Sequence, residues 1–322
     1  MLRKTIVCLL PLLLLFSCGR KNMGREEAIR SLKVLNSDFI NFFSQAGEMQ
    51  ELRALRFLWD HDSVPLPFPQ EKYSAGHPWT PYDFTSSLGV YRLDSIKNRF
   101  LPTGSDSVVR LRFSTADFNA GEFVLEKYRA APLTSRPDFP LELMAHLRLD
   151  DQERLSVSHT AEVADDLPLH ILSRVTTSAS EMNFSLDRTR DGDNGSLLIR
   201  TSLAQKGFRF IDLQMNALIG YSAMGYYFND ITFTIKAFDH LIDGTIHYGL
   251  IDPTARDYAR SFNTHSDIVI MEMPGRKVAG KLILAPNGQG DLLDYFIRFS
   301  DGHQVPVNEY LPFLNQLLYM KL

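Results

Sequence analysis

The sequence is poor in cysteine, in unbalanced charge and in long apolar runs. Among 322 residues there are only 2 cysteines, which excludes a disulfide-stapled scaffold and a zinc site built from cysteines. The 34 basic and 38 acidic side chains give a net charge of −4, which is not the positive field that attracts nucleic acid. A hydrophobic content of 44% excludes a disordered chain. The composition predicts a globular protein of one large or two modest domains.

The start of the chain has the features of an export signal, and both cysteines lie within it. Arg3 and Lys4 precede an almost wholly apolar run over residues 5–16. This run is shorter than the ~20 apolar residues with which a helix spans a bilayer. A basic head followed by a short apolar run predicts a signal peptide over residues 1–17. The mature chain then begins at Cys18 and contains no disulfide.

The end of the apolar run, Leu15-Phe16-Ser17-Cys18, resembles the lipobox of bacterial lipoproteins. The resemblance implies that the chain is cleaved before Cys18 and that the sulfur and the amine of Cys18 are lipidated. It also implies attachment to a membrane, and this attachment is stable because it uses more than one acyl chain. Glycine and not aspartate follows the cysteine, which by resemblance to Gram-negative sorting favours the outer membrane. The next residues are not acidic, so we expect a periplasm-facing body, with surface exposure as the alternative.

Residues 18–24 are expected to form a tether, and residues 25–60 a helical segment. Apolar side chains recur there at three- and four-residue steps, which predicts a helix that Gly47 ends and a second, shorter one. Their apolar positions are Ile29, Leu32, Leu35, Phe39, Phe42 and Phe43, followed by Met49, Leu52, Leu55 and Leu58. We expect the stripe to pack against a sheet. The alternative is a face lying on the membrane, for which the interspersed acidic residues are unsuited.

The middle and the end of the chain are dominated by strand patterns. Five prolines between residues 65 and 81 predict that residues 61–106 are a Pro-rich connection. From residue 107 a period of two predicts strands, and the clearest alternations meet at the polar turn over residues 150–153. The expected strands are 107–113, 141–149, 155–163, 182–186, 197–203, 208–213, 231–237, 245–250, 268–272, 281–284 and 295–299. Residues 307–319 are expected to return to helix.

Strand follows strand with short turns, and no strand–helix alternation appears, which disfavours doubly wound and barrel α/β folds. We therefore predict a mainly β (β-rich α+β) protein with large antiparallel meander sheets, a half-barrel or a sandwich, with N-terminal helices and a short C-terminal helix. The β-rich domain covers residues 107–322, with two sheet units dividing near 167 or 220. The architecture resembles the half-barrel lipoproteins that carry lipids or lipoproteins across the periplasm.

A search for catalytic and metal-binding patterns assigns no catalytic residue, metal site or cofactor. The segment 220–225 departs from the Gly-x-Ser-x-Gly nucleophile elbow, because its second glycine is one place late and a strand follows. The segment 187–195 is not a calcium loop, because Gly195 and Ser196 occupy the fifth and sixth positions counted from Asp191. The 9 histidines are scattered, without metal-ligand spacing.

Trp59, His61, His77 and Trp79 are possible ligand-facing residues. They combine both tryptophans of the chain with histidines in a loop-rich stretch, and could stack on sugars or bind a metal. The alternative is that each tryptophan covers the edge of the core while its neighbours meet water.

Ser63, Ser95 and Ser107 each follow an aspartate and precede an aliphatic residue. This pattern resembles the acceptor motif of an O-glycosylation system found in some Gram-negative envelopes. The resemblance implies that these three serines are possible O-glycosylation sites and that they face outward.

Together these features predict an outer-membrane-anchored lipoprotein that acts as a non-catalytic binding or interaction module in the cell envelope, with protein or glycan as its ligand. The first alternative is a periplasmic carrier of lipid or lipoprotein in a half-barrel pocket, which needs an apolar cavity on the order of several hundred Å³ between sheet and helix. The second alternative is a hydrolase-type envelope enzyme, which needs a cleft with clustered histidines and carboxylates.

Overall fold

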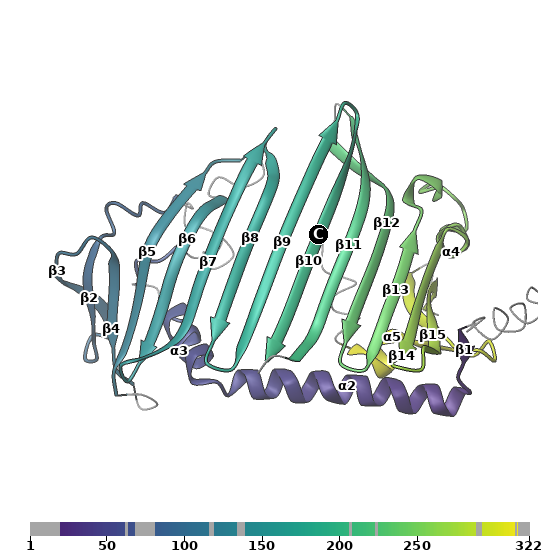
Figure 1. The fold of residues 1–322 in the computed structure, drawn as a ribbon, viewed down its shortest axis with the longest axis horizontal. Helices are drawn as coiled ribbons and strands as arrows, with labels where there is room; N and C mark the ends of the chain where they lie inside the picture. Colours follow the sequence, from purple (N-terminus) through teal and green to yellow (C-terminus); the bar gives the residue numbers. More distant parts are fainter. Residues whose placement is uncertain are drawn as a thin grey trace, which may run out of the picture. The chain divides into compact units, whose positions relative to one another are not determined.

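A computed structural model of the protein describes residues 20–61, 64–67, 81–115, 119–133, 139–205, 208–222, 225–287, 292–312 and 314. It confirms the mainly β class, since 17 strands join in one open and mostly antiparallel sheet (Figure 1). These described strands form one sheet, not the two sheets of a sandwich. The chain divides into two compact units: a smaller unit up to Phe39 and from Asp230 onward, and a larger unit over residues 40–229.

The larger unit is a meander of strands in the order β3–β2–β4–β5–β6–β7–β8–β9–β10–β11. Neighbours are antiparallel, except that β2 runs parallel to β4. The strands are β2 (Gly89–Asp94), β3 (Arg99–Gly104), β4 (Val109–Phe113), β5 (Gly121–Ala131), β6 (Phe139–Leu149), β7 (Gln152–Ala164), β8 (Leu167–Thr177), β9 (Ser180–Asp191), β10 (Asn194–Gln205) and β11 (Phe208–Ser222).

Tight turns fix the register of the long strands. Asp150 and Asp151 connect β6 to β7 with φ values of 50° and 63°. Asp165 and Asp166 connect β7 to β8 with φ values of 55° and 61°. Two consecutive left-handed residues make the turn whose twist matches that of a β-hairpin, and aspartate tolerates this backbone better than most residues. The polar turn expected at 150–153 is therefore two residues long.

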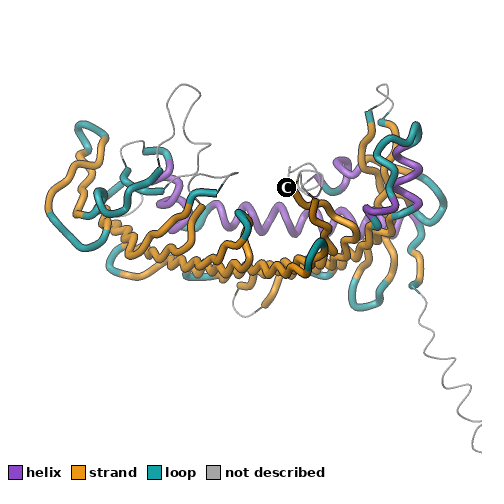
Figure 2. The backbone as a smooth tube through the Cα atoms, turned by 90° about the horizontal axis from the view of Figure 1, so that it is seen from above, coloured by secondary structure: helices purple, strands orange, loops and turns teal. Residues whose placement is uncertain are grey.

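The core of the larger unit lies between helix α3 (Gln50–Trp59) and the strands up to β7. Ala54 and Leu58 of the helix pack into a cluster with Leu111, Leu147 and Leu155, and each of these side chains is at most 1% exposed. Each fully buried leucine contributes about 1.5–3 kcal/mol to folding. Figure 2 shows the helices on one side of the strands of this unit, so the opposite side of β4–β7 has no helical layer in the described part.

Strands β8–β11 are far less buried than β4–β7. The buried side chains described there are Ile171, Arg188, Ala217 and Ile219, and most other apolar side chains are half-buried. Arg188 is buried because its guanidinium donates to backbone oxygens, among them Pro168 O at 2.8 Å and Ala164 O at 2.6 Å. Its Nη1 also donates to the Tyr221 hydroxyl at 3.0 Å. Hydrogen bonds therefore take the place of apolar packing around this side chain.

The smaller unit is built around strands β12 to β17 in sequence order, with β12 belonging to it from Asp230 onward and with β1 parallel to β15. Its elements are β1 (Lys21–Asn22), β12 (Gly225–Ala237), β13 (His240–Ile246), η2 (Tyr248–Leu250), α4 (Tyr258–Thr264), β14 (Ser266–Glu272), β15 (Lys277–Pro286), β16 (Leu293–Arg298), β17 (Gln304–Pro306) and α5 (Val307–Tyr310). Helix α2 (Arg25–Gly47) begins in this unit, with Glu26 and Glu27 in its first turn, where acidic residues favour a helix start.

Helix α2 is held in the smaller unit by apolar and polar contacts. Leu32 and Leu35 are fully buried, and the Phe39 ring meets the Phe238 ring edge-on at 5.2 Å. The buried Ser31 hydroxyl lies 2.8 Å from Nε2 of a buried histidine, His240 of β13. Burial lowers the pKa of His240, because a charged imidazole would lose its hydration there. The histidine is therefore a neutral partner for the helix.

Several expected segments differ from the structure. The connection expected over 61–106 contains β2 and β3, because the five prolines all precede residue 82 and the segments after them pair around a turn. The strand expected at 245–250 ends at Ile246, and a short 3-10 helix replaces its second half. Two residues of the expected tether form β1. Of the helix expected over 307–319, helix α5 covers Val307–Tyr310 and is capped by Leu311, and residues 313 and 315–319 lie outside the described residues.

Candidate functional site

The structure describes two of the four possible ligand-facing residues. Trp59 is the last residue of α3 and is 40% exposed. His61 follows it, with Nδ1 lying 2.7 Å from Phe57 O and Nε2 3.1 Å from Asn98 Oδ1. Both ring nitrogens of His61 are thus engaged by the protein itself. The remaining predicted site residues that lie outside the described residues are His77, Trp79, Cys18 and Ser63.

Two of the three possible O-glycosylation serines are described, and both are exposed. Ser95 lies in the turn between β2 and β3, where the Asp94 carboxylate accepts hydrogen bonds from the amides two and three residues on, each at 3.0 Å. Ser107 lies just before β4. The preceding carboxylate, Asp106, accepts a hydrogen bond from Arg110, which lowers the pKa of Asp106. The aspartates of both motifs therefore have local structural roles.

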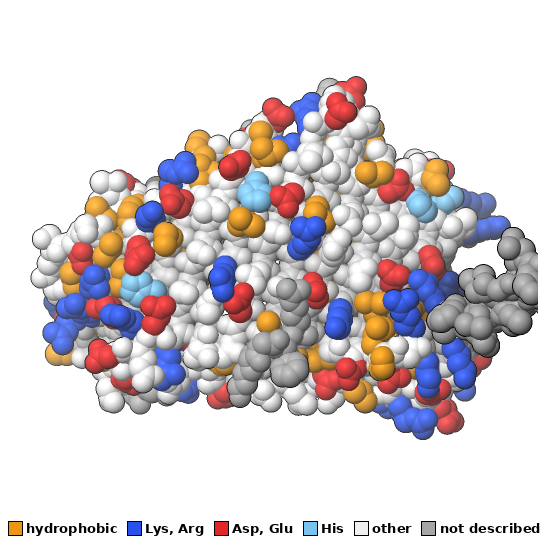
Figure 3. Space-filling model, in the orientation of Figure 1, with side chains coloured by type: hydrophobic (Ala, Val, Ile, Leu, Met, Phe, Trp, Pro, Cys, Tyr) orange, Lys and Arg blue, Asp and Glu red, His pale blue; other side chains and the backbone are white. Residues whose placement is uncertain are grey.

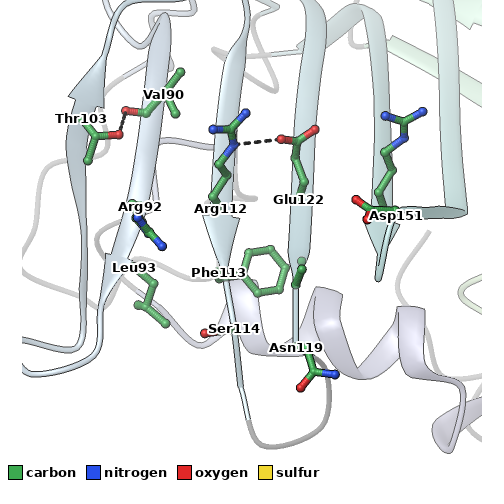
Figure 4. A pocket seen from close by; sticks show the side chains of 13 residues that line it. Val90, Arg92, Leu93, Thr103, Arg112, Phe113, Ser114, Asn119, Glu122 and Asp151 are labelled. Atoms are coloured by element: carbon green, nitrogen blue, oxygen red, sulfur yellow. Dashed lines mark hydrogen bonds and ion pairs between the residues drawn. The ribbon is translucent and has the colours of Figure 1, made fainter.

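Sequence reasoning missed a row of charged side chains that crosses four neighbouring strands of the larger unit. Arg92 of β2 is paired in register with Arg112 of β4, and Arg112 is opposite Glu122 of β5. Glu122 is in turn opposite Arg148 of β6. The row lies on the face away from α3, because the residue next to Arg148, Leu147, is buried in the core. Figure 4 shows Arg92 to one side of the Arg112–Glu122 pair.

Glu122 is the carboxylate at the centre of the row and serves two arginines. Its Oε1 pairs with Arg110 Nη1 at 2.8 Å, and its Oε2 pairs with Arg112 Nε at 3.0 Å. Burial acts to raise the pKa of Glu122, but the hydrogen bond from Arg112 and the positive charges of both arginines outweigh it and lower the pKa. Glu122 is thus ionised, and both of its oxygens are occupied.

The other two arginines of the row are exposed and have no ion pair with any residue in the described ranges. Arg92 is placed directly across from Arg112, and like charges in this position are destabilising. Arg148 lies in register with Glu122 and with Glu153, but it forms no ion pair with either. The row therefore presents guanidinium groups, and no neighbouring carboxylate in the described ranges compensates the charge of Arg92 or Arg148.

A cavity of about 550 Å³ opens over this row. Its polar lining includes Arg92, Arg112, Arg148, Glu122, Asp151, Ser114 and Asn119. Arginine presents planar donor groups that match oxyanions, and the serine hydroxyl and asparagine amide can add neutral donors. The arrangement can bind an anion that arrives from solvent.

Two further cavities lie on the same face of the sheet, over β5–β11. One of about 470 Å³ is lined by residues that include Glu126, His146, Glu153, Ser156 and Arg174. The next, of about 590 Å³, is lined by residues that include Ser158, Leu172, Arg174, Asn183, Ser185, Arg200 and Ser202. They share Arg174, so they adjoin. Figure 3 shows this face of the larger unit, with charged, histidine and hydrophobic side chains scattered over it.

Histidine–carboxylate pairs bridge neighbouring strands of this face. His170 Nδ1 lies 2.6 Å from Asp187 Oδ1, and His146 Nδ1 lies 3.2 Å from Glu126 Oε1. Both pairs are partly exposed, and each carboxylate orients its imidazole. Within the described ranges, no three histidine, cysteine or acidic side chains are grouped so that they could hold a metal ion.

Comparisons with family models, with curated proteins and with solved structures give no match. Among the described residues, no helix has the length and apolar content to cross a membrane.

Proposed function

We propose that the protein is an outer-membrane lipoprotein, anchored through Cys18, whose larger unit binds an extended saccharide polymer of the cell envelope on the face of its sheet that lies away from α3. The observation that carries the proposal is the set of cavities on one side of the sheet, spread over β2–β11, whose lining residues are mostly of polar type. They are open to solvent and follow one another across successive strands. Such a surface suits a long ligand that lies across many strands.

The chemistry of the lining favours a saccharide over a protein. Hydroxyl, amide and guanidinium groups recur on this face, as at Ser158, Asn183 and Arg200. Same-face side chains are about 6.8 Å apart along a strand and about 4.8 Å apart between strands, which gives a regular array of hydrogen-bonding groups. Protein interfaces are instead centred on aromatic and apolar anchors, and the 590 Å³ cavity offers a single well-exposed candidate, Leu172.

The same face argues against transport of a lipid. A lipid carrier needs an apolar pocket between the sheet and its helices, whereas these cavities lie on the side away from α3 and are lined mostly by polar residues. A carboxylate or guanidinium left against an acyl chain would lose its hydration without compensation. The geometry therefore favours a polar ligand.

The binding function is tested by native purification of the lipidated protein, with sugar analysis and mass spectrometry of what co-purifies. A double variant, Asn183→Ala with Arg200→Ala, removes two lining side chains of the 590 Å³ cavity. Arg129→Ala is the matched control, because Arg129 is exposed on β5 and lines none of these cavities. We expect a saccharide with the wild type and the control, and its loss from the double variant. An acyl lipid or a protein as the ligand contradicts the proposal.

The anchor is tested separately by Cys18→Ala. We expect this variant to leave the membrane fraction and to lose incorporation of a labelled fatty acid, because the proposed lipid is the attachment. A variant that stays in the membrane after salt and carbonate washes contradicts lipid anchoring. Protease treatment of intact cells then tests whether the body faces the periplasm, where it would be protected.

A further inference from the structure

The arginine row contains a local conflict that the fold does not require. Arg92 and Arg112 are direct neighbours on parallel strands, so two positively charged side chains leave the same face of the sheet in register. Because like charges in register destabilise a sheet, a neutral residue at position 92 would serve the ligand-free fold better. Natural proteins violate such a preference for favourable cross-strand pairs mainly at functional sites, where the residue is needed for function.

The charges around the cavity are not balanced by the protein. Guanidinium groups line it at Arg92, Arg112 and Arg148, against the carboxylates of Glu122 and Asp151. One of these carboxylates, Glu122, is already shared with an arginine outside the cavity lining. Arg92 and Arg148 therefore present charge at the cavity that an anion from solution can neutralise.

We propose that this row is the site for a phosphate group and, resting on the proposed function, that the phosphate is carried by the saccharide polymer. Guanidinium groups bind phosphate through paired N–H donors, and several of them together suit a doubly charged group. Ser114 and Asn119, which also line the cavity, can donate to the remaining oxygen atoms.

The arginine shared by the other two cavities has a different environment. Arg174 Nη2 pairs with Glu181 Oε2 at 2.7 Å, so its charge is compensated within the protein. The 590 Å³ cavity also holds Arg200, but the carboxylate of Asp212 lines the same cavity. Three guanidinium groups line the cavity at the β2–β6 end of the face, so the excess positive charge and the phosphate site lie there. The neutral part of the polymer extends over β7–β10, where hydroxyl and amide groups recur.

The site is tested with inorganic pyrophosphate as the probe, titrated into the detergent-solubilised lipoprotein. We expect Arg92→Gln and Arg148→Gln each to weaken binding about tenfold or more, since each removes a hydrogen bond to a charged group. Arg129→Gln, on β5 but away from the cavity, should leave the affinity unchanged. Equal affinity in all the variants, or no binding by the wild type, overturns the site.

Thermal unfolding provides a second measurement, which distinguishes a binding role of Arg92 from a structural one. We expect Arg92→Gln to raise the Tm of the ligand-free protein by about 1–3 °C, because it removes the like-charge pair. Added pyrophosphate should raise the Tm of the wild type more than that of this variant. A lower Tm for Arg92→Gln without ligand means that the arginine supports the fold, and overturns the proposal.

The source of the phosphate is distinguished by two further probes. Vesicles of phosphatidylglycerol, with phosphatidylcholine as control, test a lipid headgroup. If the wild type binds these vesicles and Arg92→Gln and Arg148→Gln abolish that binding, the assignment of the phosphate to the saccharide is overturned. If the two variants lose the co-purifying saccharide, the assignment is supported. A saccharide retained by both variants overturns the phosphate inference and leaves the proposed function intact. Pyrophosphate binding without any saccharide supports the anion site and overturns the proposed function.

Discussion

Two parts of the larger unit's sheet have similar strands but very different burial. In β4–β7 the inward side chains Leu111, Leu147 and Leu155 pack against α3 and are at most 1% exposed. In β10 the apolar side chains Leu197 and Leu203 are only half-buried. An apolar row can therefore be a core in one part of a sheet and a partly solvated surface in the next. The interactions that stabilise the two parts must therefore differ.

Strands β8–β11 depend on pairing more than on packing. The β9–β10 ladder runs without a register shift from the Asn194–Asp191 pair to the Gln205–Ser180 pair. Such long ladders satisfy the backbone hydrogen bonds, and cross-strand side-chain pairs add about 0.2–1 kcal/mol each. The stability of this region is thus spread over many weak contacts, whereas that of β4–β7 is concentrated in a few side chains.

The largest expected effect comes from comparing a leucine in each part. Leu147→Ala in the core should cost about 2–5 kcal/mol of unfolding free energy, because it leaves a cavity. Leu203→Ala in β10 should cost about 1 kcal/mol or less, because the side chain is half-buried. Urea unfolding of both variants measures the two values. Similar losses would mean that the two parts are packed alike.

The next effect comes from the buried arginine of the thinly packed part. Arg188→Met should cost about 2–3 kcal/mol, because the carbonyl groups of Ala164, Leu167 and Pro168 lose the donor that they share. Hydrogen exchange should accelerate at the β7–β8 turn and not in α3. Unchanged exchange at that turn would show that strand pairing alone fixes this region.

A buried polar group in the smaller unit extends the comparison to pH. The pKa of His240 is lowered in the folded state. The contribution of His240 to the free energy of unfolding is therefore complete above the pKa of the unfolded state, about 6.5, and is lost as the pH falls towards the pKa of the folded state. We expect the wild type to lose stability below about pH 6.5, and His240→Phe to lose less over the same range. Parallel pH profiles for the two proteins would exclude His240 as the cause.

The smallest effect is expected for an ion pair on the outer face of β4 and β5. The Arg112 side chain is 56% exposed, so Arg112→Gln should change the unfolding free energy by about 1 kcal/mol or less. The pKa of Glu122 is lowered in the folded state. The contribution of the ion pair to the free energy of unfolding is therefore present above the pKa that Glu122 has in the unfolded state and is lost as the pH falls. A loss as large as that of Leu147→Ala would place much of the stability on the face of the sheet away from α3.

The elements of the fold were predictable because they depend on local pattern. The alternation over 141–149 and the helical spacing of Leu32, Leu35 and Phe39 led to β6 and α2, and both are present. Burial was not predictable in the same way. Leu147 in β6 and Leu203 in β10 belong to similar alternations, and only tertiary packing decides which row a helix covers.

The candidate site was beyond the reach of sequence patterns for a related reason. Arg92, Arg112 and Arg148 are far apart along the chain, and only the register of β2, β4, β5 and β6 places them in one row. A single-residue shift would send one of them to the core face. The described residues that the sequence pattern singled out as ligand-facing, Trp59 and His61, lie at the end of α3, where His61 engages local partners.

The first described residues limit how far the proposed anchor can stand from the protein. Lys21 is already paired into the sheet beside β15, and Arg20 Nη2 pairs with Asp243 at 3.0 Å. Three peptide units separate Cys18 from Lys21, which is a reach of about 10 Å when fully extended. With the proposed acylation of Cys18, a connection this short would keep the protein at the bilayer surface, so the protein would search for its ligand in two dimensions.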